Sequence, residues 1–155
     1  MMLTSRLVRL VESHSEALAA GLLEKIQHSR LTPDYHKVPP EELKHRTIEI
    51  YGQLGEWLAG KDEREIERHY TVMGARRAQQ HVPLSQVTWA IVLTRDNLWE
   101  FLKKEGVPVH ANEIFSELEL LNLLEQFFDR AIYYAAVGYE RVLNTGTSHG
   151  LAKAG

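Results

Sequence analysis

Hydrophobic positions recur every three to four residues along most of the chain, which is the spacing of one buried helix face. Five helical segments are predicted, at about residues 5–30, 41–60, 62–80, 84–106 and 111–144. No long stretch alternates apolar and polar residues as a half-buried strand would. The pattern predicts an all-α domain of five to six helices, the sixth arising if Ser13 and Ser15 divide the first segment.

Capping residues and prolines mark the ends of these segments. Asp62 is placed to cap the third helix, and Pro83 ends that helix because the residue before a proline avoids the helical region. Residues 145–155 are rich in Gly, Thr, Ser and Ala. We therefore expect one helical domain over residues 1–144, with residues 145–155 as a flexible tail or the start of a linker.

The last predicted helix carries an apolar seam with strict four–three spacing, which is typical of helices that pair. The seam comprises Leu121, Leu124, Phe128, Ala131, Ala135, Gly138 and Val142. Its three small residues permit close helix approach. A helix of this predicted length spans about 50 Å, which is more than a compact domain of this size needs. The seam is therefore a candidate homodimer interface.

Composition narrows the class of protein. The chain has 155 residues, of which 44% are hydrophobic and 25% charged, as in ordinary globular domains. Its net charge of −3 argues against nucleic acid or a membrane surface as a partner. It contains no cysteine, which excludes disulfides, iron–sulfur clusters and thiol catalysis within the chain. Charged residues interrupt the N-terminal segment, so we expect no signal peptide and a cytoplasmic location.

Histidine is the residue type that most invites a cofactor, since the chain has eight. Glu42 and His45 form a single Glu-x-x-His spacing, whereas a di-iron bundle uses paired motifs. We interpret it as a solvated helix start and predict no metal ligands. His69 and His81 flank the apolar stripe of the third helix, where one could ligate haem. The alternative is that both are boundary histidines and that no cofactor is bound.

Two arginines fall on core-facing stripes, Arg77 on the third helix and Arg95 on the fourth. A buried charge must be paired or must reach a polar cavity. Glu49, Glu125 and Asp129 are possible partners for an ion pair that fixes helix register. The other hypothesis is an anion-recognising pocket between the third and fourth helices. The candidate ligand-binding residues are His69, Arg77, His81 and Arg95.

Catalytic motifs are missing from the sequence. It has no Gly-x-Ser-x-Gly elbow, no glycine-rich phosphate loop and no dinucleotide fingerprint. Neighbouring carboxylates occur in charge runs typical of solvated helix faces, such as Asp62–Glu63. We therefore predict no catalytic residues and a protein that is not an enzyme.

One stretch carries a family resemblance. It runs from His69 through Arg76–Arg77 to the turn at Pro83, and then to Leu93-Thr-Arg95 and Leu98–Trp99. Over roughly residues 3–143 the chain resembles the N-terminal domain of RsbR- and RsbRD-type regulators, the RsbT co-antagonists. His81 departs from the pattern, because the resemblance leads us to expect a glycine at this turn.

The resemblance implies a globin-like helical fold without haem that serves as a sensor in bacterial stress signalling. It also implies dimerisation through the last helices and relay of a signal along the long helix to a signalling partner or a fused output domain. Two alternatives stay open. One is a globin-like sensor that binds haem or a small ligand, and the other is a metal-binding helical bundle.

Overall fold

The computed structural model describes residues 2–60, 62–105 and 114–154, and these ranges contain helices and no strand. The all-α prediction is confirmed. In chain order the elements are α1 (Met2–Ser13), α2 (Ser15–His28), the 3-10 helix η1 (Pro33–Lys37), α3 (Pro40–Gly60), α4 (Glu63–Gln79), α5 (Leu84–Lys104) and α6 (Ile114–Ala154). Within the described ranges, every helix is too short or too polar to traverse a lipid bilayer.

The first predicted segment is two helices, divided at His14 between the two serines that favoured a break. The hydroxyl of Ser13 donates to the carbonyl oxygen of Arg9 at 2.7 Å. Nδ1 of His14 lies 2.9 Å from the carbonyl oxygen of Leu10. Such side chains compete with the helical hydrogen bonds of the backbone. The chain therefore turns here and begins α2.

Both ends of α4 have identifiable caps. At its start, Oδ1 of Asp62 accepts a hydrogen bond from the backbone nitrogen of Arg64 at 3.1 Å, as the predicted N-cap requires. At its end, His81 adopts φ 60°, the left-handed region that favours glycine. The amides of His81 and Val82 then bond back to the carbonyls of Ala78 and Arg77. This is a Schellman C-cap with histidine in the glycine position.

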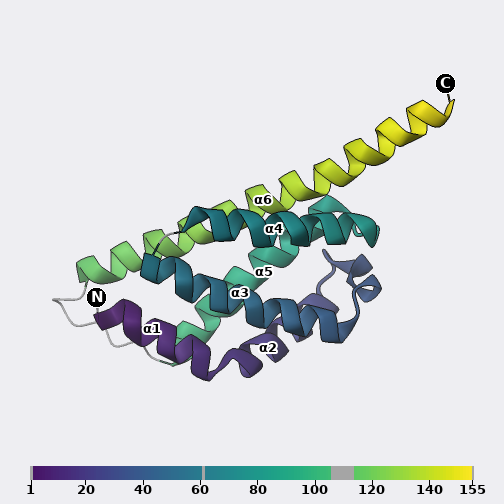
Figure 1. Cartoon of the computed structure of the whole chain (residues 1–155). Coiled ribbons are helices and arrows are strands. Elements are labelled where there is room, and N and C mark those ends of the chain that lie inside the picture. Colours follow the sequence, from purple (N-terminus) through teal and green to yellow (C-terminus); the bar gives the residue numbers. More distant parts are fainter. Residues whose placement is uncertain (1, 61, 106–113, 155) are drawn as a thin grey trace.

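The helices enclose one apolar core to which all six α-helices contribute. Helix α6 runs along the top of Figure 1 beside α4, while α1 and α2 lie at the bottom. Trp57 of α3 ties into α6 by donating from its indole nitrogen to the carbonyl oxygen of Leu123 at 3.0 Å. Tyr139 of α6 donates to the carbonyl oxygen of Val82 at the α4–α5 turn, at 2.6 Å.

Helices α4 and α6 touch through their backbones at two glycines. A Cβ added to Gly74 would lie 2.7 Å from the carbonyl carbon of Ala135, and one added to Gly138 would lie 2.7 Å from the carbonyl carbon of Thr71. Real Cβ atoms do not approach other atoms so closely. Both positions therefore require glycine for the two helices to pack at this distance, and each glycine Cα–H can contact the facing carbonyl.

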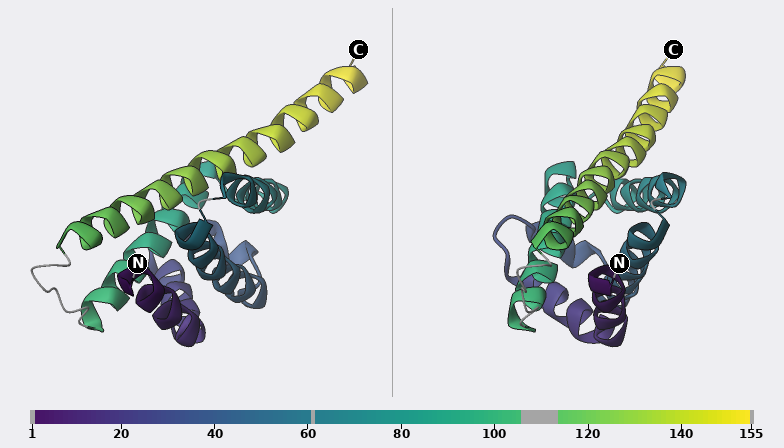
Figure 2. Two further views of the ribbon diagram at one scale, coloured as in Figure 1. Left: turned by 60° about the vertical axis from the view of Figure 1, so that its left-hand side comes forward. Right: turned by 90° about the vertical axis from the view of Figure 1, so that its left-hand side faces the viewer.

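Helix α6 continues to Ala154, past Thr145, where the flexible tail was predicted to begin. Figures 1 and 2 show this C-terminal end projecting beyond the other helices. An existing helix extends without a new nucleation step, so each weak helix former after Thr145 costs only about 1 kcal/mol or less. The helix therefore continues through this stretch. The predicted start near residue 111 lies outside the described residues.

Candidate functional site

The four residues predicted to bind a ligand do not converge. His69 lies in the middle of α4 and faces α3, whereas Arg77 lies two turns further along α4 and is fully buried. His81 is exposed at the turn after α4. Arg95 lies on α5, where its guanidinium is 3.7 Å from the carboxylate of Glu125 on α6. Each side chain therefore has separate surroundings.

Arg77 belongs to a network of charged and polar groups around Glu42. Its Nη1 lies 3.3 Å from Oε1 of Glu42 and donates to Gln80 at 2.8 Å, and Arg76 also bonds to Glu42 at 3.0 Å. Its guanidinium carbon lies 6.0 Å from the ring centre of Tyr35. Burial raises the pKa of Glu42, but the hydrogen bond from Arg76 and the charge of Arg77 outweigh it, so that this pKa lies below its ordinary value.

The arrangement of this network matches an ion pair that fixes helix register, with Glu42 as the partner. The sequence indicated Glu49, Glu125 and Asp129 as possible partners. It did not indicate Glu42, which lies near the start of α3, 35 positions from Arg77. Glu42 and His45 form the Glu-x-x-His spacing, yet they contact different groups. Nε2 of His45 lies 3.3 Å from a carboxylate oxygen of Glu49.

Most of the predicted dimer seam is covered by the domain itself. The chain's own helices, α4 foremost among them, pack over its central residues, and their relative exposure is at most a few per cent where it is measured. These residues are Leu124, Phe128, Ala131, Ala135 and Gly138. Leu121 and Val142, at the ends of the seam, are half-buried. The small residues thus serve the close α4–α6 contact inside one chain, because that contact needs backbone to meet backbone.

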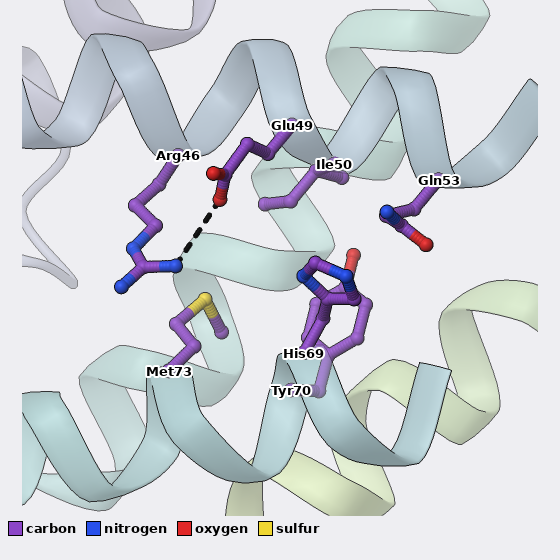
Figure 3. A pocket seen from close by; sticks show the side chains of 7 residues that line it. All are labelled: Arg46, Glu49, Ile50, Gln53, His69, Tyr70 and Met73. Carbon is purple, nitrogen blue, oxygen red and sulfur yellow. Dashed lines mark hydrogen bonds and ion pairs between the residues drawn. The ribbon is translucent and has the colours of Figure 1, made fainter. Parts of the chain in front are cut away.

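A small recess of about 10 Å³, room for about one water molecule, lies between α3 and α4. Figure 3 shows side chains reaching into it from both helices: Arg46, Glu49, Ile50 and Gln53 from α3, and His69, Tyr70 and Met73 from α4. Arg46 donates to Glu49 at 3.1 Å. Nε2 of His69 lies 3.6 Å from a carboxylate oxygen of Glu65, one turn earlier on α4.

Tyr70 is the most deeply buried residue of this recess. It is 2% exposed, and its ring packs edge-on against Phe127 with 6.0 Å between the centres. Its hydroxyl is buried and has no hydrogen-bond partner among the residues that the structure describes. Burial raises the pKa of Tyr70 well above its usual value. The hydroxyl therefore stays protonated and can donate a hydrogen bond into the recess.

Two features of the described residues bear on the cofactor alternatives. The recess beside His69 has a volume of only about 10 Å³, and charged side chains line it, so this recess does not fit haem. Across the described side chains, no group of three or more His, Asp or Glu residues could hold a metal ion.

Comparison with protein families identifies the domain. The family model described as the RsbT co-antagonist protein rsbRD N-terminal domain matches residues 16–146. The chain belongs to this family. Comparisons with curated proteins and with solved structures find no match. This RsbRD N-terminal domain is therefore placed among stress-signalling regulators by its family.

The RsbRD N-terminal domain keeps a left-handed turn where the resemblance led us to expect glycine, although His81 occupies it. Of the residues that line its recess, only His69 was predicted as a site residue, so Arg46 and Tyr70 were missed. Tyr70 lies on the apolar stripe of α4, where a buried tyrosine hydroxyl needs a hydrogen-bond partner. This position could have indicated Tyr70 from the sequence. Arg46 lies beside the recess because α3 faces α4, which no local pattern indicates.

Proposed function

We propose that this RsbRD N-terminal domain is a non-catalytic sensory module that forms a homodimer and relays a signal through α6. The observation that carries the proposal is α6 itself. Its stretch from Leu123 to Tyr139 contributes buried side chains such as Phe127 and Phe128 to the core, and its C-terminal end projects beyond the other helices (Figure 2). A single helix thus joins the core to an arm that a signalling partner or output domain can contact.

The second copy is expected to dock on the outer face of α6, because the inner seam is already covered. Tyr133 on this face is 63% exposed, and the half-buried Ala136 and Val137 are its neighbours. Leu143, further along the arm, is 52% exposed. Exposed apolar side chains on one helix face support an interface between copies, since a two-fold dimer uses the same patch on both chains.

Sedimentation equilibrium of the purified chain at high micromolar concentration tests the proposal. The expected result is a dimer, which Tyr133→Arg converts to a monomer because it places two like charges in one interface. Leu31→Arg is the matched control. Leu31 is 55% exposed but precedes η1, away from α6, so this variant is expected to remain dimeric.

A second measurement uses the absence of cysteine from the natural sequence. Val137→Cys introduces a unique thiol on the outer face of α6, and mild oxidation should then cross-link two copies. Leu31→Cys should stay uncross-linked under the same conditions. A strictly monomeric wild-type chain, or equal cross-linking of both variants, would refute dimerisation through this face.

A further inference from the structure

We infer that the turn between α4 and α5 couples the η1 segment to the part of α6 that leaves the core. The inference names an input for the relay proposed for α6, and it rests on that proposal only for its biological role. The coupling itself lies within one chain and does not depend on dimerisation. Its basis is that η1 and α6 each bond to a backbone carbonyl of the same turn.

The two bonds go to neighbouring residues. Lys37 of η1 donates from its ammonium group to the carbonyl oxygen of His81 at 3.0 Å. The hydroxyl of Tyr139 in α6 donates to the carbonyl oxygen of Val82 at 2.6 Å. Among the residues that the structure describes, no hydrogen bond or ion pair joins η1 directly to α6. The turn is therefore their shared attachment.

Tyr139 holds α6 at the point where the helix leaves the core. Its side chain is 8% exposed, whereas the side chains of residues 140–145, which follow it, are half-buried or exposed. Beyond them α6 projects past the other helices (Figure 2). A change in the position of the Val82 carbonyl therefore acts on the start of the projecting part.

The η1 segment has further contacts at the same end of the molecule. The backbone nitrogen of Asp34 donates to Oε1 of Gln86, in the first turn of α5, at 2.7 Å. Tyr35 is buried, with its ring beside the guanidinium group of Arg77 near the end of α4. A displacement of η1 therefore reaches the ends of both helices that the turn connects.

The turn is strained, which gives it a second conformation to adopt. His81 has φ 60°, a left-handed conformation that is unfavourable for any residue with a Cβ. Such a conformation persists only while the surrounding bonds hold it. Loss of one bond favours relaxation of the turn, which moves the carbonyl that the other bond needs. One element with two conformations that both sites bias is the physical requirement for coupling.

The test is hydrogen exchange of backbone amides, followed by NMR on the whole labelled chain. Lys37→Met should raise exchange at Val142 and Leu143 about threefold relative to amides of α2, as loss of one exposed hydrogen bond does. Tyr139→Phe should raise exchange of the Val38 amide, which bonds to the carbonyl oxygen of Tyr35 in η1. Both directions are expected because coupling between two sites is reciprocal.

Two further variants separate coupling from a general loss of stability. Arg68→Met is the matched control, because it breaks an exposed ion pair with Glu65 on α4 away from the turn, and it should change neither set of amides. His81→Gly relieves the strain and should slow exchange in η1 and α6 together, about threefold.

Exchange that rises only in the element carrying the substitution would overturn the coupling. An equal rise with Arg68→Met, or unchanged exchange with His81→Gly, would overturn it as well. The solution mass is measured separately, so the dimer and the coupling can fail independently.

Discussion

Replacing Gly74 with alanine isolates the contact on which the α4–α6 packing depends. The added Cβ would lie 2.7 Å from the carbonyl carbon of Ala135, whereas comfortable carbon–carbon contacts are about 3.5–4.0 Å. The carbonyl oxygen of Ala135 would lie closer still, so the helices must part by more than about 1 Å, which also loosens the reciprocal contact of Gly138 with Thr71. Such overpacking costs about 3 kcal/mol, offset by about 1 kcal/mol of gained helix propensity.

The net expectation is a loss of about 2 kcal/mol in the free energy of unfolding, which lowers the urea midpoint by about 1 M for a chain of this size. Gly52 on α3 is the control, because it is exposed and an added Cβ would meet nothing within 4 Å. Gly52→Ala should raise stability by up to about 1 kcal/mol. If Gly74→Ala matched or exceeded the wild-type stability while Gly52→Ala stabilised, the close backbone contact would be refuted.

Three further predictions concern single side chains, and urea unfolding checks each. Glu42→Gln leaves Arg77 as an unpaired buried cation and should cost about 3 kcal/mol. Because the pKa of Glu42 is lowered in the folded protein, its contribution to the free energy of unfolding is complete above pH 4.5 and is lost as the pH falls through the folded-state pKa. The Glu42→Gln variant should not show this loss. Tyr139→Phe removes a bonded hydroxyl and should cost about 1 kcal/mol, whereas Tyr70→Phe removes an unpartnered one and should be neutral or stabilising. His81→Gly should stabilise by about 0.5–1 kcal/mol because it relieves the left-handed backbone, and an unchanged midpoint would count against that strain.

Local features of the chain could be predicted because they depend on neighbours in sequence. The break near Ser13, the cap at Asp62 and the end of α4 before Pro83 each reflect a side chain acting on its own backbone. The glycine expected at the turn after α4 also corresponds to a real conformation, which His81 adopts. The all-α fold follows from these elements and from their apolar stripes.

Contacts between helices could not be predicted in the same way. The small residues around Ala135 and Gly138 correctly indicated a close approach, but the period of a helix does not say which helix approaches. The partner is α4 of the same chain, through Gly74. Likewise, the sequence indicated that a buried Arg77 needs a carboxylate partner. That partner is Glu42, because α3 lies beside α4 in the fold. Pairing across space depends on the whole fold.

The glycine contact also limits how α6 can move. Where Gly74 and Gly138 bring backbone against backbone, rolling α6 about its own axis would drive a neighbouring side chain into α4. Of the possible motions, a tilt of α6 centred on this contact displaces the two glycines least. From Gly138 to Ala154 is 16 residues, or about 24 Å of helix. On such a lever a tilt of about 5° moves the far end by roughly 2 Å, a shift comparable to those that reset helix contacts between subunits.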